Sequence, residues 1–320
     1  MKHMKFLSFF LGITFSIVAC SSNNETIPVP DVDPDGDDGT TEVEFAKGAD
    51  IGWVTEYESK GYNFYNAKGE QRECTALMKE LGLNAIRIRV WVDPSKHGNW
   101  CNTADVVEKV KRAKELGMDV MIDFHYSDWW ADPAQQNKPA SWVGKNLANL
   151  KSAIKDHTVS VLQALKAIGV IPKWVQVGNE IRPGMLWDED VALSGASYNV
   201  TEKDLKDAPA SATDKVVYPM NWANLGAFVT TGYDAVKSVF PDAIVIVHLD
   251  NGWDSSLFTW FFDELKKNGG KWDMIGMSLY PYWSRDAKEG YSSADAVITD
   301  CISNIKALST KYNCDVMVVE

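Results

Sequence analysis

Two short apolar segments of this chain each end in a glutamate, and two such carboxylates could perform acid–base chemistry. The first segment, residues 174–179, leads into Glu180, and the second, residues 316–319, leads into Glu320. Continuous apolar segments of this length are typical of strands buried on both faces in a parallel sheet. Because a carboxylate at the C-terminal end of such a strand opens onto the catalytic face of a barrel enzyme, the pair predicts a glycosidase.

The alternative interpretation is that both glutamates merely cap ordinary strands at the surface. Asn179 beside Glu180, together with nearby aromatic residues, favours the catalytic pair. A catalytic acid needs a raised pKa, which burial and a neighbouring anion can supply. The nucleophile must stay ionised, and we expect a guanidinium such as that of Arg89 beside it. Asn179 could donate a hydrogen bond to the 2-hydroxyl of a sugar, a contact that strengthens in the transition state.

Polar and aromatic side chains are also expected at the C-terminal ends of the other strands. The predicted substrate-binding residues are Asp50, Arg89, Trp91, Asp123, His125, Asn179, His248, Asn251, Tyr280 and Trp283, with Arg87, Tyr126, Asp128, Asp250 and Tyr282 as further strand-end residues. Together they would surround one opening that fits a polyhydroxylated chain, oriented by hydrogen bonds and stacked on rings. A structural role is the alternative for His125 and His248. A metal site is disfavoured, because no second cluster of ligands accompanies Asp123 and His125.

The elements that must position these residues alternate between strand and helix. The expected strands are residues 46–51, 84–91, 118–124, 172–178, 243–249, 273–280 and 315–320. The expected helices are residues 72–81, 103–116, 148–168, 222–240, 256–268 and 293–312. Most of these helices are followed by glycine and then a strand, which is typical of right-handed βα units. A doubly wound open sheet is disfavoured, because no glycine-rich phosphate turn follows the first strand.

This order predicts an α/β fold, a (β/α)₈ TIM barrel whose eighth βα unit is missing from the sequence. A barrel without its closing strand would leave two open edges, so we expect the natural protein to continue past Glu320. The long segment 188–221 follows the strand that carries Glu180. Connections of that length usually serve binding or are partly disordered.

The N-terminal part of the chain reads as a targeting segment followed by a tether. Residues 1–20 combine two lysines with an apolar stretch too short to span a bilayer, and residues 17–20 resemble a bacterial lipobox. We expect export, cleavage before Cys20 and lipid attachment there; a plain secretory signal is the alternative. Residues 21–44 are polar and predict a flexible linker, which leaves residues 45–320 as the catalytic barrel.

The net charge and the cysteine content limit which binding partners, metal sites and disulfides are expected. The net charge of −12 disfavours nucleic acid, while a neutral polysaccharide needs no electrostatic steering. Four cysteines remain after the lipid cysteine, and neither a C-x-x-C pair nor a histidine cluster suggests zinc. Cys74 and Cys101 would both lie near the top of the barrel on neighbouring units, so we expect a disulfide between them, and none between Cys301 and Cys314. We expect a monomer that needs no cofactor.

Six sequence strings carry a family resemblance. They are GADI at 48–51, RIRVWV at 87–92, DFHYSD at 123–128, QVGNE at 176–180, HLDNG at 248–252 and SLYPYW at 278–283. In order and together, they resemble the arabinogalactan endo-β-1,4-galactanases of glycoside hydrolase family 53. The resemblance implies endo-cleavage of the β-1,4-galactan side chains of pectin with retention of configuration. It also implies that Glu180 is the acid/base and Glu320 the nucleophile.

Further properties follow from the same resemblance. Some bacterial members bind calcium in the loop after the seventh strand, which here would lie beyond Glu320. A lipoprotein signal on such an enzyme is similar to the surface glycan-degrading systems of Bacteroidetes-like bacteria, so we expect lipid anchoring to the outer membrane or cell surface. The alternatives are another endo-β-1,4-glycanase of the clan, such as a mannanase, glucanase or xylanase, or a non-catalytic glycan-binding lipoprotein.

Overall fold

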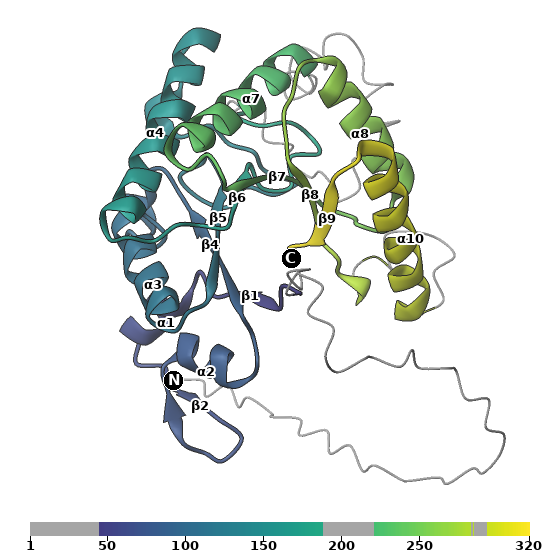
Figure 1. Ribbon diagram of the computed structural model, residues 1–320. Helices are drawn as coiled ribbons and strands as arrows, with labels where there is room; N and C mark the ends of the chain where they lie inside the picture. Colours follow the sequence, from purple (N-terminus) through teal and green to yellow (C-terminus); the bar gives the residue numbers. More distant parts are fainter. Residues whose placement is uncertain (1–44, 188–220, 283, 285–292) are drawn as a thin grey trace, which may run out of the picture. The chain divides into compact units, whose positions relative to one another are not determined.

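The computed structural model describes residues 45–187, 221–282, 284 and 293–320 (Figure 1). The chain divides into two units, residues 1–44 and 45–320, and all the described residues belong to the second. The expected signal segment, the linker and Cys20 therefore lie outside the described residues, as does most of segment 188–221. Among the helices of the described ranges, none combines the length and apolar character needed to cross a bilayer.

Seven parallel strands form one curled sheet. They are β1 (Gly48–Asp50), β4 (Ala85–Val90), β5 (Asp119–Phe124), β6 (Trp174–Val177), β7 (Ile244–Leu249), β8 (Met274–Met277) and β9 (Asp315–Val318), hydrogen-bonded in the order β1-β4-β5-β6-β7-β8-β9. Figure 1 shows the strands around a common centre with the helices outside. The barrel class and all seven strands predicted from the sequence are confirmed. Within the described residues, β1 and β9 are the two edges of this sheet.

The helices cover the outside of the sheet. They are α1 (Val54–Ser59), α2 (Cys74–Glu80), α3 (Thr103–Glu115), α4 (Leu147–Ala167), α7 (Trp222–Val239), α8 (Ser255–Lys267) and α10 (Ala294–Tyr312), with short 3₁₀ turns at Pro94–His97 and Ala140–Trp142. Side-chain caps start several of them, because a side-chain oxygen can accept from an otherwise unpaired N–H group. Asn102 accepts from the backbone of Asp105, and Ser293 accepts from that of Ala296.

The segment between the first strand and α2 differs from the prediction. It contains the short helix α1 and a two-stranded antiparallel hairpin, β2 (Phe64–Tyr65) with β3 (Gln71–Arg72). The helix expected from residue 72 therefore begins two residues later, at Cys74, where Glu73 accepts a hydrogen bond from the backbone of Ala76.

The inside of the barrel is layered. An apolar layer is formed by Ala85, Met121, Trp174, Ile246 and Met274, one from each of the strands β4 to β8. Alternate residues of a strand share a face, so positions two or four further along these strands also point inward. Those positions hold Arg87, Arg89, Asp123, Gln176 and His248, all buried. The polar site therefore rests on an apolar floor, whereas a larger apolar core fills the space between the sheet and the helices.

The expected disulfide is not formed. Cys74 and Cys101 are both free, buried thiols. Cys74 packs into the core at the start of α2, whereas the Cys101 thiol donates to the carbonyl of Gly52 at 3.3 Å. Burial raises the pKa of Cys74 to about 11, so this thiol stays protonated and unreactive. The expectation was wrong because nearness to one end of a barrel does not direct two side chains toward each other.

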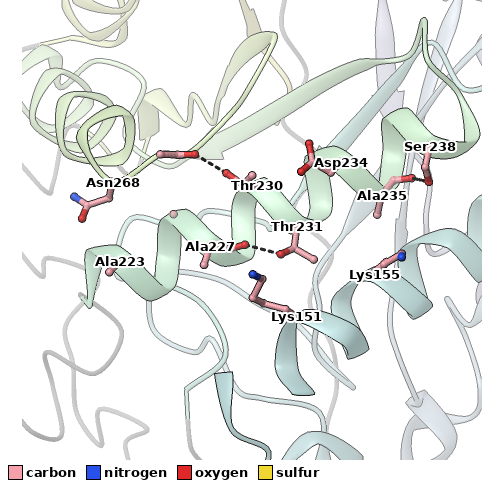
Figure 2. Close-up of a pocket in the computed structure, with 12 residues that line it drawn as sticks. Lys151, Lys155, Ala223, Ala227, Thr230, Thr231, Asp234, Ala235, Ser238 and Asn268 are labelled. Carbon is pink, nitrogen blue, oxygen red and sulfur yellow. Dashed lines mark hydrogen bonds between the residues drawn. The ribbon is translucent and has the colours of Figure 1, made fainter. Parts of the chain in front are cut away.

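The outer surface of the helices has a groove, which is lined by different residues from the polar layer inside the barrel. Figure 2 shows that α4, α7 and the end of α8 enclose it, with small residues of α7 along its wall. Gly226 permits this close packing, since a Cβ there would lie 2.3 Å from the carbonyl oxygen of Asn268. The hydroxyls of Thr230 and Thr231 donate to backbone carbonyls, at 2.6 and 2.7 Å. We interpret the groove as a helix-packing feature.

Candidate active site

Arg87 is the centre of the polar layer. Its guanidinium contacts Gln176 Oε1 at 3.3 Å and, more closely, one group from each of four strand ends. These are Asp50 Oδ2 at 2.9 Å, Asp123 Oδ2 at 2.9 Å, Asn179 Oδ1 at 2.7 Å and Glu320 Oε2 at 3.0 Å. Three of these partners are carboxylates, and the arginine side chain that they surround is almost fully buried. The arrangement fixes the guanidinium beside Glu320, where the two side chains form an ion pair.

The guanidinium beside Glu320 was expected to be Arg89, and this prediction is corrected. Arg87 and Arg89 share the inner face of β4, but Arg87 lies one pleat deeper, at the level of the carboxylates. Arg89 lies nearer the opening, 3.6 Å from Asp50 Oδ1. Its guanidinium packs on two indoles, 5.1 Å from the ring centre of Trp91 and 4.1 Å from that of Trp130.

Glu180 lies at the end of β6 in a strained turn. Its backbone has a φ of 48°, unusual for a residue with a side chain, and Gly178 before it has a φ of 82°. A Cβ on Gly178 would lie 2.5 Å from Ile181, so glycine is required there for space as well as for conformation. The turn directs a carboxyl group, on a residue only 8% exposed, into the barrel opening.

The two glutamates meet, as predicted from the sequence. One carboxylate oxygen of Glu180 and one of Glu320 lie within 4.8 Å of each other. This is the short separation of retaining glycosidases, in which carboxyl groups about 5–5.5 Å apart leave no room for a water between sugar and nucleophile. The pair therefore has the geometry for a covalent glycosyl intermediate.

The environments of the two carboxyl groups differ. Burial raises the pKa of Glu180 well above its ordinary value, and the negative charges of Asp250 and Glu320 raise it further. Glu320 instead contacts Arg87 and accepts a hydrogen bond from the Tyr280 hydroxyl at 2.8 Å. Burial and the charge of Glu320 raise the pKa of Tyr280, so its phenol remains a donor. Paired carboxyl groups in contrasting surroundings are the signature of an acid and a nucleophile.

A chain of hydrogen bonds runs beneath Glu180. The Ser278 hydroxyl donates to Glu180 Oε1 at 2.6 Å, and Ser278 Oγ lies 2.8 Å from His248 Nε2. Because the hydroxyl proton is directed at the carboxylate, we assign the Nε2–H tautomer to His248, which then donates to Ser278. Burial, with Arg87 nearby, lowers the pKa of His248 well below its ordinary value, so the imidazole is neutral.

A second network holds Asn179. Its Nδ2 donates to the carbonyl of Ala131 at 2.8 Å, and its Oδ1 accepts from Arg87 and from Gln176 Nε2 at 3.0 Å. Gln176 also donates to Asp123 Oδ1 at 2.6 Å. These contacts fix the orientation of the amide, and one N–H of its Nδ2 remains for a further acceptor.

Asp123 and His125 support this network from β5. Burial alone would raise the pKa of Asp123, but the charge of Arg87 and the hydrogen bond with His125 outweigh it and lower the pKa. His125 Nε2 lies 2.9 Å from Asp123 Oδ2, and its Nδ1 accepts from the backbone of Ala131 at 2.9 Å. Both residues are buried, so they position the site from below.

The described residues offer one candidate group for a metal ion, formed by Glu180, His248 and Glu320. Its imidazole is fully buried, with Ser278 at one ring nitrogen and two donors, Gln176 Nε2 and the backbone N–H of Glu180, at the other. The group therefore serves proton transfer and charge stabilisation, for which two carboxyl groups suffice without a cofactor. The calcium site implied by the sequence resemblance would lie beyond Glu320, outside the described residues.

A comparison with known families decides the class of this site. The sequence profile described as glycosyl hydrolase family 53 matches residues 46–320, nearly the whole barrel unit. This chain belongs to glycosyl hydrolase family 53. The two glutamates of this family 53 hydrolase thus lie in a barrel where paired carboxyl groups are the expected catalytic machinery.

Several known proteins are similar to this family 53 chain. A protein of Niallia circulans, described as uncharacterised, is 35% identical over 279 residues, covering 87% of this chain and 68% of the relative. An arabinogalactan endo-β-1,4-galactanase of Thermothelomyces thermophilus is 31% identical over 280 residues, covering 86% and 73% respectively. Among solved structures, a fungal β-1,4-galactanase has a TM-score of 0.69 at 27% identity, covering 86% of this chain and 73% of that chain.

The structure brings most of the predicted site residues of this hydrolase together. The hydrogen-bonded cluster contains Asp50, Asp123, His125, Asn179, Glu180, His248, Tyr280 and Glu320. Arg89 and Trp91 lie at its edge. Asn251 instead shapes the turn after β7, with a φ of 54° and a carbonyl that accepts from the backbone of Asp254. Trp283 lies outside the described residues.

Three residues at the site were absent from the predicted set. Arg87 was noted at a strand end, but its deeper position gives it the central role. Gln176 and Ser278 are uncharged residues of types common on any surface. Their signal in the sequence was their place inside two of the strings that carry the resemblance, QVGNE and SLYPYW.

Proposed function

We propose that this protein is an endo-acting, retaining β-1,4-galactanase that cleaves the galactan side chains of pectin. The observation that carries the proposal is the close approach of two carboxyl groups in opposite environments, with oxygens within 4.8 Å. The choice of galactan is supported by the relative from Thermothelomyces thermophilus and by the fungal structure, both described as β-1,4-galactanases.

In the first step, Glu320 attacks the anomeric carbon while Glu180 donates its proton to the leaving glycosidic oxygen. The bond from the anomeric carbon to that oxygen breaks, and an ester forms between the sugar and Glu320. Arg87 and Tyr280 hold the Glu320 carboxylate in place before attack, at 3.0 and 2.8 Å. The raised pKa of Glu180 keeps its proton available for this step.

In the second step, Glu180 accepts a proton from water, which attacks the same carbon and releases Glu320. The pKa of Glu180 changes in the direction that this reversed role requires. The charge of Glu320 contributes to the raised pKa of Glu180, and that charge is absent while Glu320 is esterified. The pKa of Glu180 therefore falls in the intermediate, which makes the carboxylate available as a base. Two displacements on one carbon give overall retention.

A polysaccharide panel tests the proposal. We expect the full-length protein to release reducing ends from β-1,4-galactan, with oligosaccharides of mixed length early in the reaction and the β-anomer formed first by NMR. Mannan, xylan and cellulose are the control substrates. Cleavage of one of these in place of galactan would indicate another glycanase of the clan, and galactan binding without turnover would indicate a glycan-binding protein.

Ser278 provides a test of the acid/base assignment. In Ser278→Ala, the Glu180 carboxylate loses a charge-assisted hydrogen bond of 2.6 Å, so the protonated form gains relative stability. Activity is lost as pH rises through the pKa of Glu180, and we expect this alkaline limb of kcat/KM to move upward by about one pH unit.

Ser278→Thr keeps a hydroxyl and is the matched control, expected to restore the wild-type limb. A serine that served packing alone would lower activity at every pH without moving the limb. An unshifted limb in Ser278→Ala would therefore contradict the role of Glu180 as the acid.

The location of the enzyme is a further proposal. The lipobox-like residues 17–20 and the polar segment 21–44 support export and a lipid anchor at Cys20 that holds the catalytic unit away from the membrane. A surface position suits a polysaccharide too large to enter a cell. The expected monomer likewise stays a prediction.

A further inference from the structure

A groove of about 550 Å³ leads away from the active site along the ends of β1, β4 and β5. Its walls are aromatic, with Trp53, Tyr57, Tyr62, Phe64, Trp91 and Trp130 among the lining residues. Arg89 also lines it and connects the groove to the catalytic cluster through its contact with Asp50. The groove is therefore continuous with the site and extends toward the β2–β3 hairpin.

The aromatic rings at the outer end brace one another. Ring centres are 5.0 Å apart for Trp53 and Tyr57, 5.1 Å for Tyr57 and Tyr62, and 5.7 Å for Trp53 and Phe64. Tyr57 and Tyr62 are nevertheless 42% and 57% exposed. Single exposed tyrosines are ordinary, but a braced row beside a catalytic site is a surface with fixed positions for stacking.

At the inner end of the groove, two hydrogen-bond donors have no acceptor. Within the described residues, Arg89 Nε and Trp91 Nε1 are buried and have no hydrogen-bond partner. The two residues are only 4% and 2% exposed. Buried donors are almost always paired in folded proteins, and leaving one unpaired is costly. Both residues line the groove, so a hydroxyl oxygen of a ligand within it could satisfy them.

The charges along the groove are compensated. Arg89 is close to Asp50, and Lys60 at the outer end forms an ion pair with Glu56 at 2.6 Å. A groove with balanced charges favours a neutral ligand over an anionic one. Aromatic faces combined with hydrogen-bond donors are suited to sugar rings, which present both C–H faces and hydroxyls.

We propose that this groove binds successive β-1,4-linked galactosyl units of the chain under cleavage, and that Tyr57 and Tyr62 form its remote stacking platform. The choice of sugar rests on the proposed function. The two tyrosines belong to α1 and the following turn, apart from the catalytic cluster. They should therefore set the preference for long chains and leave bond cleavage itself unchanged.

The test compares substrate lengths in the full-length protein. Tyr57→Ala and Tyr62→Ala are each expected to lower kcat/KM on galactan and long galacto-oligosaccharides about tenfold, the order of one lost aromatic contact. The shortest oligosaccharide that is cleaved should show less than a twofold change. Tyr57→Phe keeps the ring and should resemble the wild type. Tyr65→Ala is the matched control, since Tyr65 is 55% exposed on the neighbouring strand β2 but does not line the groove.

Equal losses at all lengths, or none on long chains, would overturn the inference. If the wild type cleaves mannan or xylan and not galactan, the proposed function fails. The same variants are then tested on oligomers of the polymer that is cleaved. A loss that grows with oligomer length supports binding of the chain in the groove, and an equal loss at all lengths refutes it. If no polymer is cleaved, retardation of the wild type in galactan gels, lost in Tyr57→Ala and Tyr62→Ala, supports the groove, and equal mobilities refute it.

Discussion

Glu320→Ala is expected to reduce hydrolysis of galactan by on the order of 10⁵- to 10⁶-fold, because it removes the group that attacks the anomeric carbon. The loss should be chemical and should leave the fold intact. Arg87 keeps two carboxylate partners in this variant, Asp50 and Asp123, each at 2.9 Å. An unchanged melting temperature, together with the kinetics, would check this expectation.

Azide provides a positive result from the same variant. The space vacated by the Glu320 side chain admits a small anion. This anion can attack the anomeric carbon of an activated aryl galactoside from the side that Glu320 occupied, opposite the leaving group. We therefore expect azide to restore turnover and to yield a galactosyl azide of inverted configuration, identified by NMR. Glu58→Ala is the control, because Glu58 pairs with Arg112 away from the site. Substantial activity without azide, or an azide product of retained configuration, would exclude Glu320 as the nucleophile.

The barrel strands could be predicted because burial on both faces leaves a plain signal. Strands β4 to β8 are covered by helices outside and by the barrel interior inside, so most of their residues are apolar. Helix α1 and the β2–β3 hairpin lack that signal. Their six- and two-residue elements are too short for any periodicity to emerge, and only one of their ten residues, Val54, is buried.

The strand ends could be located from the sequence, but depth within the barrel could not. Arg87 and Arg89 are indistinguishable by alternation, since both point inward. Which of them reaches Glu320 depends on the stagger between neighbouring strands, where Asp50 pairs with Arg87 and Asp123 with Arg89. Stagger of this kind arises from the curvature of the whole sheet and has no local sequence signature.

The supporting residues escaped prediction for a different reason. Ser278 and Gln176 carry no charge and no unusual spacing, so only their contacts identify them. The Ser278 hydroxyl touches Glu180, and the Gln176 amide links Asp123 to Asn179. Networks of this type depend on side chains from several strands converging at one level, which a linear pattern does not encode.

Glu180→Ala is expected to divide substrates by their leaving groups. Galactan has a poor leaving group, so the loss of protonation should slow it by about 10²- to 10⁴-fold. The acidic phenol of an activated aryl galactoside leaves without receiving a proton. Formation of the glycosyl intermediate from such a substrate should therefore be nearly unaffected. Water then attacks the intermediate slowly without a base, and a burst of phenol followed by slow turnover should be seen by stopped-flow measurement.

The pH profile of the same variant completes the assignment. In the wild type, burial and two neighbouring anions raise the pKa of Glu180, so the acid form persists to higher pH and activity falls only above that pKa. Without Glu180, this alkaline limb should vanish. Glu180→Gln is the matched control, since it keeps the side-chain size and the contact with Ser278 but has no proton to transfer. Equal losses on galactan and on activated aryl galactosides, or a retained alkaline limb, would exclude Glu180 as the acid/base.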